Sequence, residues 1–258
     1  MLKNKTILKI LTLISFILMI VVNAAANILP INGITAGGVS DSYPNLFAPA
    51  GVTFSIWGLI YLLLAIYVVY QFFPKPKKTQ LLINQINRYF IFSSIINSTW
   101  IFFWHYQMIG MTVILTLLLL YSLIKISNLS NDEGFFLKDK LFIKIPFGVY
   151  FGWITIATIA NITTFFVSLG WSDFIFSDQI WMITVLLVGL VIASWKTITS
   201  KNLAYGLVPI WAYYGIYLKH TSALDFNNEY PTIILVTMIC IMIFVMVNFY
   251  LFIKKTIF

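Results

Sequence analysis

Charged residues are scarce in this chain of 258 residues: they make up 9% of it, against 60% hydrophobic residues. Soluble domains carry about 25% charged and roughly 45–50% apolar residues, so a soluble fold would leave too much apolar surface in water. The single cysteine, Cys240, excludes a disulfide framework and a thiolate metal cluster. The chain also lacks a G-x-x-x-x-G-K-[ST] loop, the phosphate-binding signature of many nucleotide-binding proteins.

What the chain has instead is eight long apolar stretches, separated by short polar loops. Each stretch is close to the ~20 residues that a helix needs to cross ~30 Å of hydrocarbon, whereas the alternating strands of a membrane β-barrel are absent. We therefore predict an all-α integral membrane protein with eight transmembrane helices. They are expected at residues 7–27, 52–73, 88–107, 109–126, 142–168, 179–195, 202–218 and 230–253.

The basic residues predict the topology. Fifteen of the 16 Lys and Arg residues lie at every second boundary between the stretches, and only Lys219 departs from this pattern. Because positive loops are retained on the cytoplasmic side, we expect both termini to be cytoplasmic. The net charge of +8 then reflects topology in a lipid bilayer, and no nucleic-acid partner is expected. One arginine among many lysines, with abundant Ile and Asn, is typical of an AT-rich genome, so we expect a bacterial cell membrane.

The first stretch has a second interpretation. Its basic start, its apolar run and the sequence Ala24-Ala25-Ala26 also resemble a signal peptide with an A-x-A cleavage site. The apolar run through Val22 is longer than the usual h-region of ~7–15 residues. We therefore favour retention of the first helix, while cleavage stays open.

Ionisable residues are absent from the middle of every predicted span. Proton relays, ion-coupled transporters and voltage sensors need such groups, so these classes are disfavoured. His105 and His220 fall at or beyond external helix ends, where we expect them to be solvated, and they suggest no metal site or haem axial ligand within the spans. No spaced His, Cys or carboxylate constellation predicts catalysis. We expect neither catalytic residues nor a bound metal or cofactor.

The predicted spans carry aromatic and amide side chains on single faces. The helix at 88–107 has Ser93, Asn97, Trp100 and Trp104 at such spacing. Three other helices repeat the pattern: Thr53, Trp57, Tyr61 and Leu64; Tyr150, Trp153, Ala157, Ala160, Asn161 and Thr164; and Leu207, Trp211, Tyr214 and Leu218.

The tryptophans divide by predicted depth. Trp104, Trp171, Trp181 and Trp195 lie near predicted interfaces and fit the aromatic belt of membrane proteins. Trp57, Trp100, Trp153 and Trp211 lie too deep for the belt. For these, ordinary packing and an aromatic ligand pocket are equal alternatives. Aromatic walls with a few amides would suit a flat apolar ligand with polar edges.

Three segments resemble the tryptophan-rich sensory protein family, also called TspO or translocator protein. Pro49 leads a segment that ends in Trp57-Gly-Leu-Ile-Tyr61, and Asn97-Ser-Thr-Trp100 precedes two further aromatics. Pro146 is followed by Trp153-Ile-Thr-Ile-Ala157-Thr-Ile-Ala-Asn161. The segments occur in the family's order. The resemblance covers residues 1–170 and implies a TspO-like five-helix bundle, with residues 171–258 as an additional three-helix module.

This resemblance implies a non-catalytic membrane receptor, carrier or sensory protein. Its hydrophobic ligand would be a small molecule such as a tetrapyrrole, porphyrin or haem. The residues implied to line the ligand cavity are Trp57, Tyr61, Asn97, Trp100, Trp153, Ala157 and Asn161. The glycine-containing loop at 31–50 would cover the cavity as a lid, and a plain extracellular connector is an equal alternative.

Some positions depart from the family's pattern. Gly51 and Ser55 stand where the family usually has Trp and Pro, and the segment after Asn161 lacks the Tyr and Lys/Arg of the sterol-recognition pattern. Sterol binding therefore gains no support.

A different class stays open as the alternative: a permease subunit of a multicomponent ABC-type exporter of peptides or lantibiotics. Its basic cytoplasmic loops would dock a separate ATPase. We expect the last three helices to pack beside the five-helix core, where a second subunit would otherwise sit. A homodimer and an unidentified membrane partner both stay open.

Overall fold

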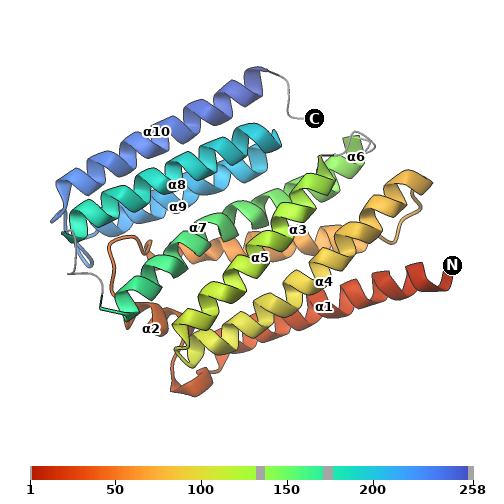
Figure 1. Ribbon diagram of the computed structural model, residues 1–258, viewed down its shortest axis with the longest axis horizontal. Helices are drawn as coiled ribbons and strands as arrows, with labels where there is room; N and C mark the ends of the chain where they lie inside the picture. The colour runs from red at the N-terminus through yellow and green to blue at the C-terminus, as the bar shows by residue number, and fades with distance from the viewer. Residues whose placement is uncertain (1, 132–136, 171–176, 255–258) are drawn as a thin grey trace.

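The computed structural model describes residues 2–131, 137–170 and 177–254, and within these ranges it is built of helices without strands. The long helices lie side by side along one direction, and α8, α9 and α10 form a group next to α7 (Figure 1). The long helices are α1 (Leu2–Ile28), α3 (Ile56–Tyr70), α4 (Lys77–His105), α5 (Ile109–Ser130), α7 (Ile145–Ser168), α8 (Asp178–Ser200), α9 (Leu203–Thr221) and α10 (Pro231–Ile253). The shorter elements are α2 (Ala36–Asp41), α6 (Leu137–Asp139) and a π-helical turn at Lys140–Lys144.

Most predicted helices agree with the structure to within a few residues, but α4 begins at Lys77 rather than at residue 88. Polar residues such as Asn87 and Arg88 made this segment look like a loop. In the structure Thr79, Ile83, Asn87 and Phe90 are fully buried, at the spacing of one helical face. The predicted basic loop is therefore largely the first three turns of α4.

The outer loop, residues 29–55, also has more structure than the sequence suggested. It contains α2 and two short 3-10 turns, Ile31–Gly33 and Gly51–Ser55. The side chain of Thr35 caps α2 by accepting a hydrogen bond from the Gly38 amide. Asn32 and Gly33 adopt positive φ values of 55° and 74°, a conformation that asparagine and glycine tolerate best.

Six segments of the described chain are long and apolar enough to cross a membrane: 6–28, 51–70, 109–130, 140–168, 178–200 and 231–253. The protein is therefore an all-α, multi-pass membrane protein. The remaining two predicted spans correspond to α4 and α9, which carry more polar residues and lie among the other helices (Figure 1).

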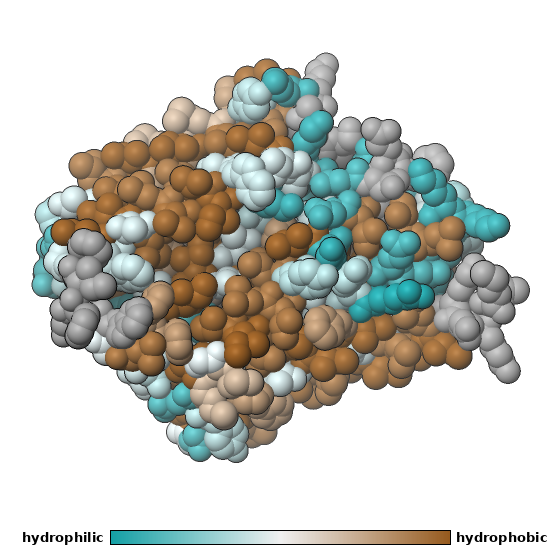
Figure 2. Space-filling view, in the orientation of Figure 1, coloured by the Kyte–Doolittle hydropathy of each residue, from teal (hydrophilic) through white to brown (hydrophobic). Residues whose placement is uncertain are grey.

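The outer surface agrees with this environment. Figure 2 shows hydrophobic side chains over much of the visible face, while hydrophilic ones gather toward the end of the bundle that holds α6 and the start of α1. Exposed apolar residues include Ile14 of α1, Val191 of α8 and Met246 of α10. In water such a surface would be unfavourable, but acyl chains cover it at no such cost.

Lysines from separate parts of the chain meet at that same end. Lys9 lies near Lys75, and Lys140 and Lys201 lie near Lys144, close enough in each case for electrostatic interaction. Burial lowers the pKa of Lys75; the Asp139 carboxylate opposes this shift, and the Lys9 ammonium adds to it. The alternation of lysines along the sequence thus becomes a basic end of the folded bundle.

Close contact between α7 and α9 joins the two parts of the bundle. A Cβ at Gly152 would lie 2.8 Å from the carbonyl oxygen of Tyr205 and 2.8 Å from Val208. Pro209 has no N–H to bond the Tyr205 carbonyl within α9, so this carbonyl is free to face the glycine. Small residues at such positions let helices approach closely in membranes.

Candidate functional site

Aromatic rings from the outer loop, α3 and α7 form one cluster. Trp57 stacks on Tyr61 one turn along α3, with ring centroids 5.5 Å apart. It also meets Tyr150 and Trp153 of α7 edge-on at 6.0 and 6.4 Å, and Phe54 contacts Trp153 at 5.8 Å. These distances are typical of favourable aromatic pairs. We call these five residues the aromatic cluster.

Trp153 differs from the neighbouring tryptophans in its hydrogen bonding. Its indole Nε1 is buried and has no hydrogen-bond partner among the described residues. By contrast, the Nε1 atoms of Trp100, Trp104 and Trp211 each donate a hydrogen bond. Most buried polar groups are paired, so an unpaired N–H beside the aromatic cluster is a feature that a ligand acceptor atom would satisfy.

Asn97 connects three helices beside the aromatic cluster. Its Oδ1 accepts a hydrogen bond from Asn23 of α1 at 2.8 Å, and its Nδ2 donates to the Tyr150 hydroxyl at 3.3 Å. Asn23 was not among the predicted site residues. The available signal was that Asn23 and Asn27 are amides in the otherwise apolar second half of the first stretch.

Asn161 lies at the centre of a second polar group, between α4, α5 and α7. Its Oδ1 accepts from Trp100 Nε1 at 3.1 Å and from Thr116 Oγ1 at 2.8 Å. Its Nδ2 donates to Thr112 Oγ1 at 2.9 Å. The two threonines were missed by sequence reasoning, although their spacing of four residues places them on one face of α5.

The seven predicted site residues thus fall around one face of α7. Trp57, Tyr61 and Trp153 belong to the aromatic cluster, Asn97 adjoins it through Tyr150, and Trp100 bonds Asn161. Ala157, partly exposed, lies one turn from both Trp153 and Asn161.

The outer loop is tied to the end of α4 at one side. Trp104 Nε1 donates to the Ala36 carbonyl at 3.0 Å, and Asn32 Nδ2 donates to the His105 carbonyl at 3.1 Å. Val39 packs with Trp104 in a small buried core. The prediction that Trp104 belongs to the aromatic belt is therefore wrong. Trp104 is buried and holds α2 in place. Trp171 lies outside the described residues.

The other side of the loop is tied to α9. The Ala50 amide donates to the Gly215 carbonyl at 3.0 Å, and Trp211 Nε1 donates to the Thr53 carbonyl at 2.9 Å. His220 Nε2 lies 2.9 Å from the Leu46 carbonyl. The loop therefore bridges two distant parts of the bundle.

Both histidines are fully buried, so the expectation that they are solvated is wrong. His105 Nδ1 contacts the Ile101 carbonyl at 2.8 Å. The reason in both cases is that the outer loop covers these helix ends. Within the described part of the chain no three His, Cys, Asp or Glu residues gather in a way that could hold a metal ion.

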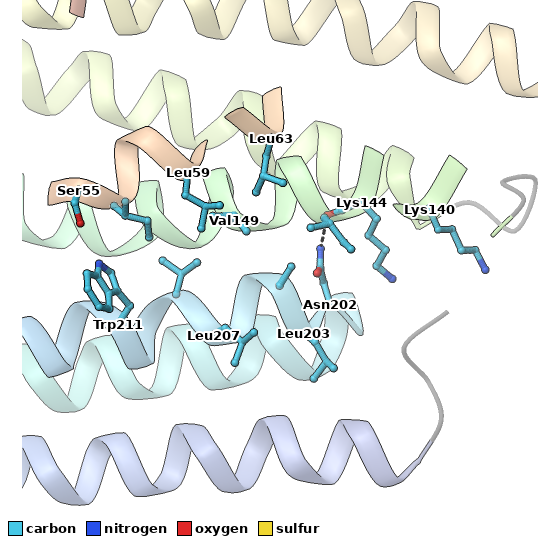
Figure 3. A pocket seen from close by; sticks show the side chains of 14 residues that line it. Ser55, Leu59, Leu63, Lys140, Lys144, Val149, Asn202, Leu203, Leu207 and Trp211 are labelled. Atoms are coloured by element: carbon cyan, nitrogen blue, oxygen red, sulfur yellow. Dashed lines mark hydrogen bonds between the residues drawn. The ribbon is translucent and has the colours of Figure 1, made fainter. Parts of the chain in front are cut away.

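The predicted aromatic stripe on α9 does not face the aromatic cluster. Leu207 and Tyr214 are exposed, and Trp211 is half-buried against the outer loop. Instead, one side of α9 borders a cavity of about 670 Å³ between α3, α7 and α9 (Figure 3). Its described lining includes Trp211 but none of the seven predicted ligand residues.

A model of the TSPO-like protein family matches residues 9–250 of the sequence. The chain belongs to the TSPO-like family. The match continues past residue 170, where the sequence resemblance ended, through α8 and α9 and into α10. Comparisons with curated proteins and with solved structures found no match. A boundary between two domains at residue 170 stays a prediction.

Proposed function

We propose that this TSPO-like protein is a non-catalytic membrane receptor or carrier that binds a flat hydrophobic molecule, a tetrapyrrole such as a porphyrin or haem, at the aromatic cluster. Family membership supports the proposal, since TSPO proteins bind hydrophobic ligands. The observation that carries it is the buried, unpaired Nε1 of Trp153 among aromatic rings.

Each part of this site has a chemical role in the proposal. The ring faces of Trp57 and Tyr61 supply contact area for a planar macrocycle. Trp153 donates a hydrogen bond to an acceptor atom of the ligand. The amide groups of Asn97 and Asn161 hold the helices in register and limit the orientation of the ligand.

We further propose that all eight long helices cross the membrane, with both termini and the basic end on the cytoplasmic side. α4 is 29 residues long, about 43 Å at 1.5 Å per residue, and so long enough to span the hydrocarbon. In this arrangement the outer loop is external. It then acts as the lid over the aromatic cluster.

Porphyrin titration of the purified protein, followed by tryptophan fluorescence and porphyrin absorbance, tests the proposal. We expect Trp153→Phe to weaken binding about 5–30-fold, the effect of losing one buried hydrogen bond. Ala157→Phe, one turn from Trp153 on α7, should weaken binding by placing a bulky ring where the ligand would lie. Trp195→Phe, on the exposed side of α8, is the control and should bind as the wild type does.

Thermal unfolding of each variant separates loss of binding from loss of structure. Absence of porphyrin binding to the wild type, or equal binding by wild type and both site variants, would contradict the proposal. Co-purification of a soluble ATPase in that case would favour the exporter alternative.

A further inference from the structure

The cavity between α3, α7 and α9 is an apolar groove. Leu59 and Leu63 of α3, Val149 of α7 and Leu207 of α9 form its walls, and Trp211 lies at one end (Figure 3). Its volume of about 670 Å³ falls within the 300–1,000 Å³ usual for small-molecule sites. Leu59 and Leu207 are exposed, so the groove opens sideways toward the bilayer.

The end of the groove opposite Trp211 is basic. Lys140 and Lys144 line it and come from the π-helical turn that precedes α7 (Figure 3). Lys201 lies near enough to Lys144 to interact electrostatically. The Asp139 carboxylate accepts a hydrogen bond from Tyr70 at 2.7 Å and is absent from the groove's described lining. No Asp or Glu side chain is therefore among the described residues that line this basic end.

The side chain of Asn202 holds this basic end in place. Asn202 caps the start of α9 through its Oδ1, which accepts from the Tyr205 amide, while its Nδ2 donates to the Lys144 carbonyl at 3.0 Å. A Cβ at Gly148 would collide with the Asn202 side chain, which fixes how closely the two elements approach. The positive end of the α9 dipole adds to the field of the lysines.

We propose that the groove binds an anionic phospholipid from the leaflet on the basic side of the membrane. Lys140 and Lys144 hold the phosphate, and one acyl chain lies along the leucines toward Trp211. The α3 wall from Ile56 to Leu63 is about 10 Å long, which fits within the ~15 Å hydrocarbon depth of one leaflet. Basic pockets between transmembrane helices on the cytoplasmic side recognise such headgroups.

Two observations favour a membrane lipid over a soluble anion. The walls are apolar over nearly their whole length, so a small anion would leave them unoccupied. The exposed rim at Leu59 and Leu207 gives access from the acyl-chain region. This site is separate from the aromatic cluster, because the described lining contains no residue of that cluster.

The test uses Trp211 as a reporter. The full-length protein is placed in nanodiscs that contain a small fraction of either phosphatidylglycerol or phosphatidylcholine with brominated chains. Bromine quenches tryptophan at short range, and the difference between wild type and Trp211→Phe isolates the Trp211 signal. We expect brominated phosphatidylglycerol to quench Trp211 at a much lower fraction than brominated phosphatidylcholine does.

The double substitution Lys140→Gln and Lys144→Gln should reduce this preference about 30-fold. The matched control, Lys77→Gln with Lys125→Gln, removes two lysines that do not line the groove and should keep it. Ala204→Phe narrows the groove without changing its charge and should also abolish the signal. This variant tests the site even where the lysine variant fails to fold.

Equal quenching of Trp211 by the two lipids would overturn the proposal. An equal loss of the phosphatidylglycerol preference in the Lys77→Gln and Lys125→Gln control would also overturn it, because it would indicate general attraction to anionic membranes. A preference displaced by free inorganic phosphate would indicate an anion site rather than a lipid site, and would likewise overturn it.

Discussion

Trp211 of α9 donates its indole N–H to the backbone carbonyl of Thr53, so a hydrogen bond of 2.9 Å joins residues 158 positions apart. Directly beside it, Gly215 packs its backbone against the Thr53 side chain. The end of the outer loop is therefore positioned by a helix that belongs to the last part of the chain. Because Trp57 and Tyr61 follow this loop, α9 also helps to place the aromatic cluster.

Gly215→Ala should be destabilising, because the new methyl group would collide with Thr53 Oγ1. We expect the free energy of unfolding to fall by about 1–3 kcal/mol, as measured by thermal or denaturant unfolding in detergent. Gly58→Ala is the control, since its Cβ would meet nothing within 4 Å. It should be neutral or stabilising by up to about 1 kcal/mol. Equal behaviour of the two variants would argue against the close packing described.

Asn161→Leu should destabilise the bundle, because it leaves the N–H of Trp100 without its acceptor and removes the hydrogen bonds that join Asn161 to Thr112 and Thr116. We expect a loss of about 1–3 kcal/mol, together with a shift in tryptophan emission as the Trp100 environment changes. Thr184→Val on α8 is the matched control, since that hydroxyl donates to Ile180 within its own helix. An unchanged emission spectrum would show that the Trp100 bond is not formed.

The first helix should remain in the mature protein. Phe16 and Met19 are buried, and Asn23 donates to Asn97 of α4, so cleavage after the alanines would strip apolar and polar contacts from the bundle. N-terminal sequencing of protein purified from membranes should give a start that lies before Phe16, so that the first helix is intact. A sequence that begins just after the alanine cluster would contradict this prediction.

The hydrogen bonds of Trp104 and Trp211 should restrain the outer loop. Replacing both residues with Phe removes the bonds to Ala36 and Thr53 while keeping aromatic rings. We expect amide hydrogen exchange across the loop to become at least about tenfold faster, since each lost bond is worth about 1 kcal/mol. Trp195→Phe should leave exchange unchanged. If exchange is already fast in the wild type, the loop is a loose connector rather than a tied lid.

The sequence predicted helices correctly where the spacing of apolar and polar side chains matched the lipid-facing and buried sides of the helix. The apolar stretches predicted the helices well, and the α7 motif from Trp153 to Asn161 predicted a face that does meet α3, α4 and α5. The predicted range for α4 was too short because Asn87 looks like a loop residue. In the bundle it accepts from Tyr67 and donates to Gln71 at 2.7 Å, and partners from another helix cannot be seen in a local pattern.

Other features depend on contacts between distant segments. His220 looked solvated because its partner, the Leu46 carbonyl, lies in a loop near the start of the chain. The groove between α3, α7 and α9 is built from leucines and lysines that are ordinary in any apolar helix and any basic loop. Only the packing of α9 on α7 brings them together.

The tie between the outer loop and α9 has a consequence for biosynthesis. At about 5–20 residues per second, the ribosome needs roughly 8–30 s to pass from Thr53 to Trp211. During that interval the Leu46 and Thr53 carbonyls lack the partners that they have in the finished protein. The outer loop can therefore close only after α9, which carries Trp211 and His220, has been synthesised. A chain that ended near residue 170 would lack α9, and its outer loop would lack the hydrogen bonds from Trp211 and His220.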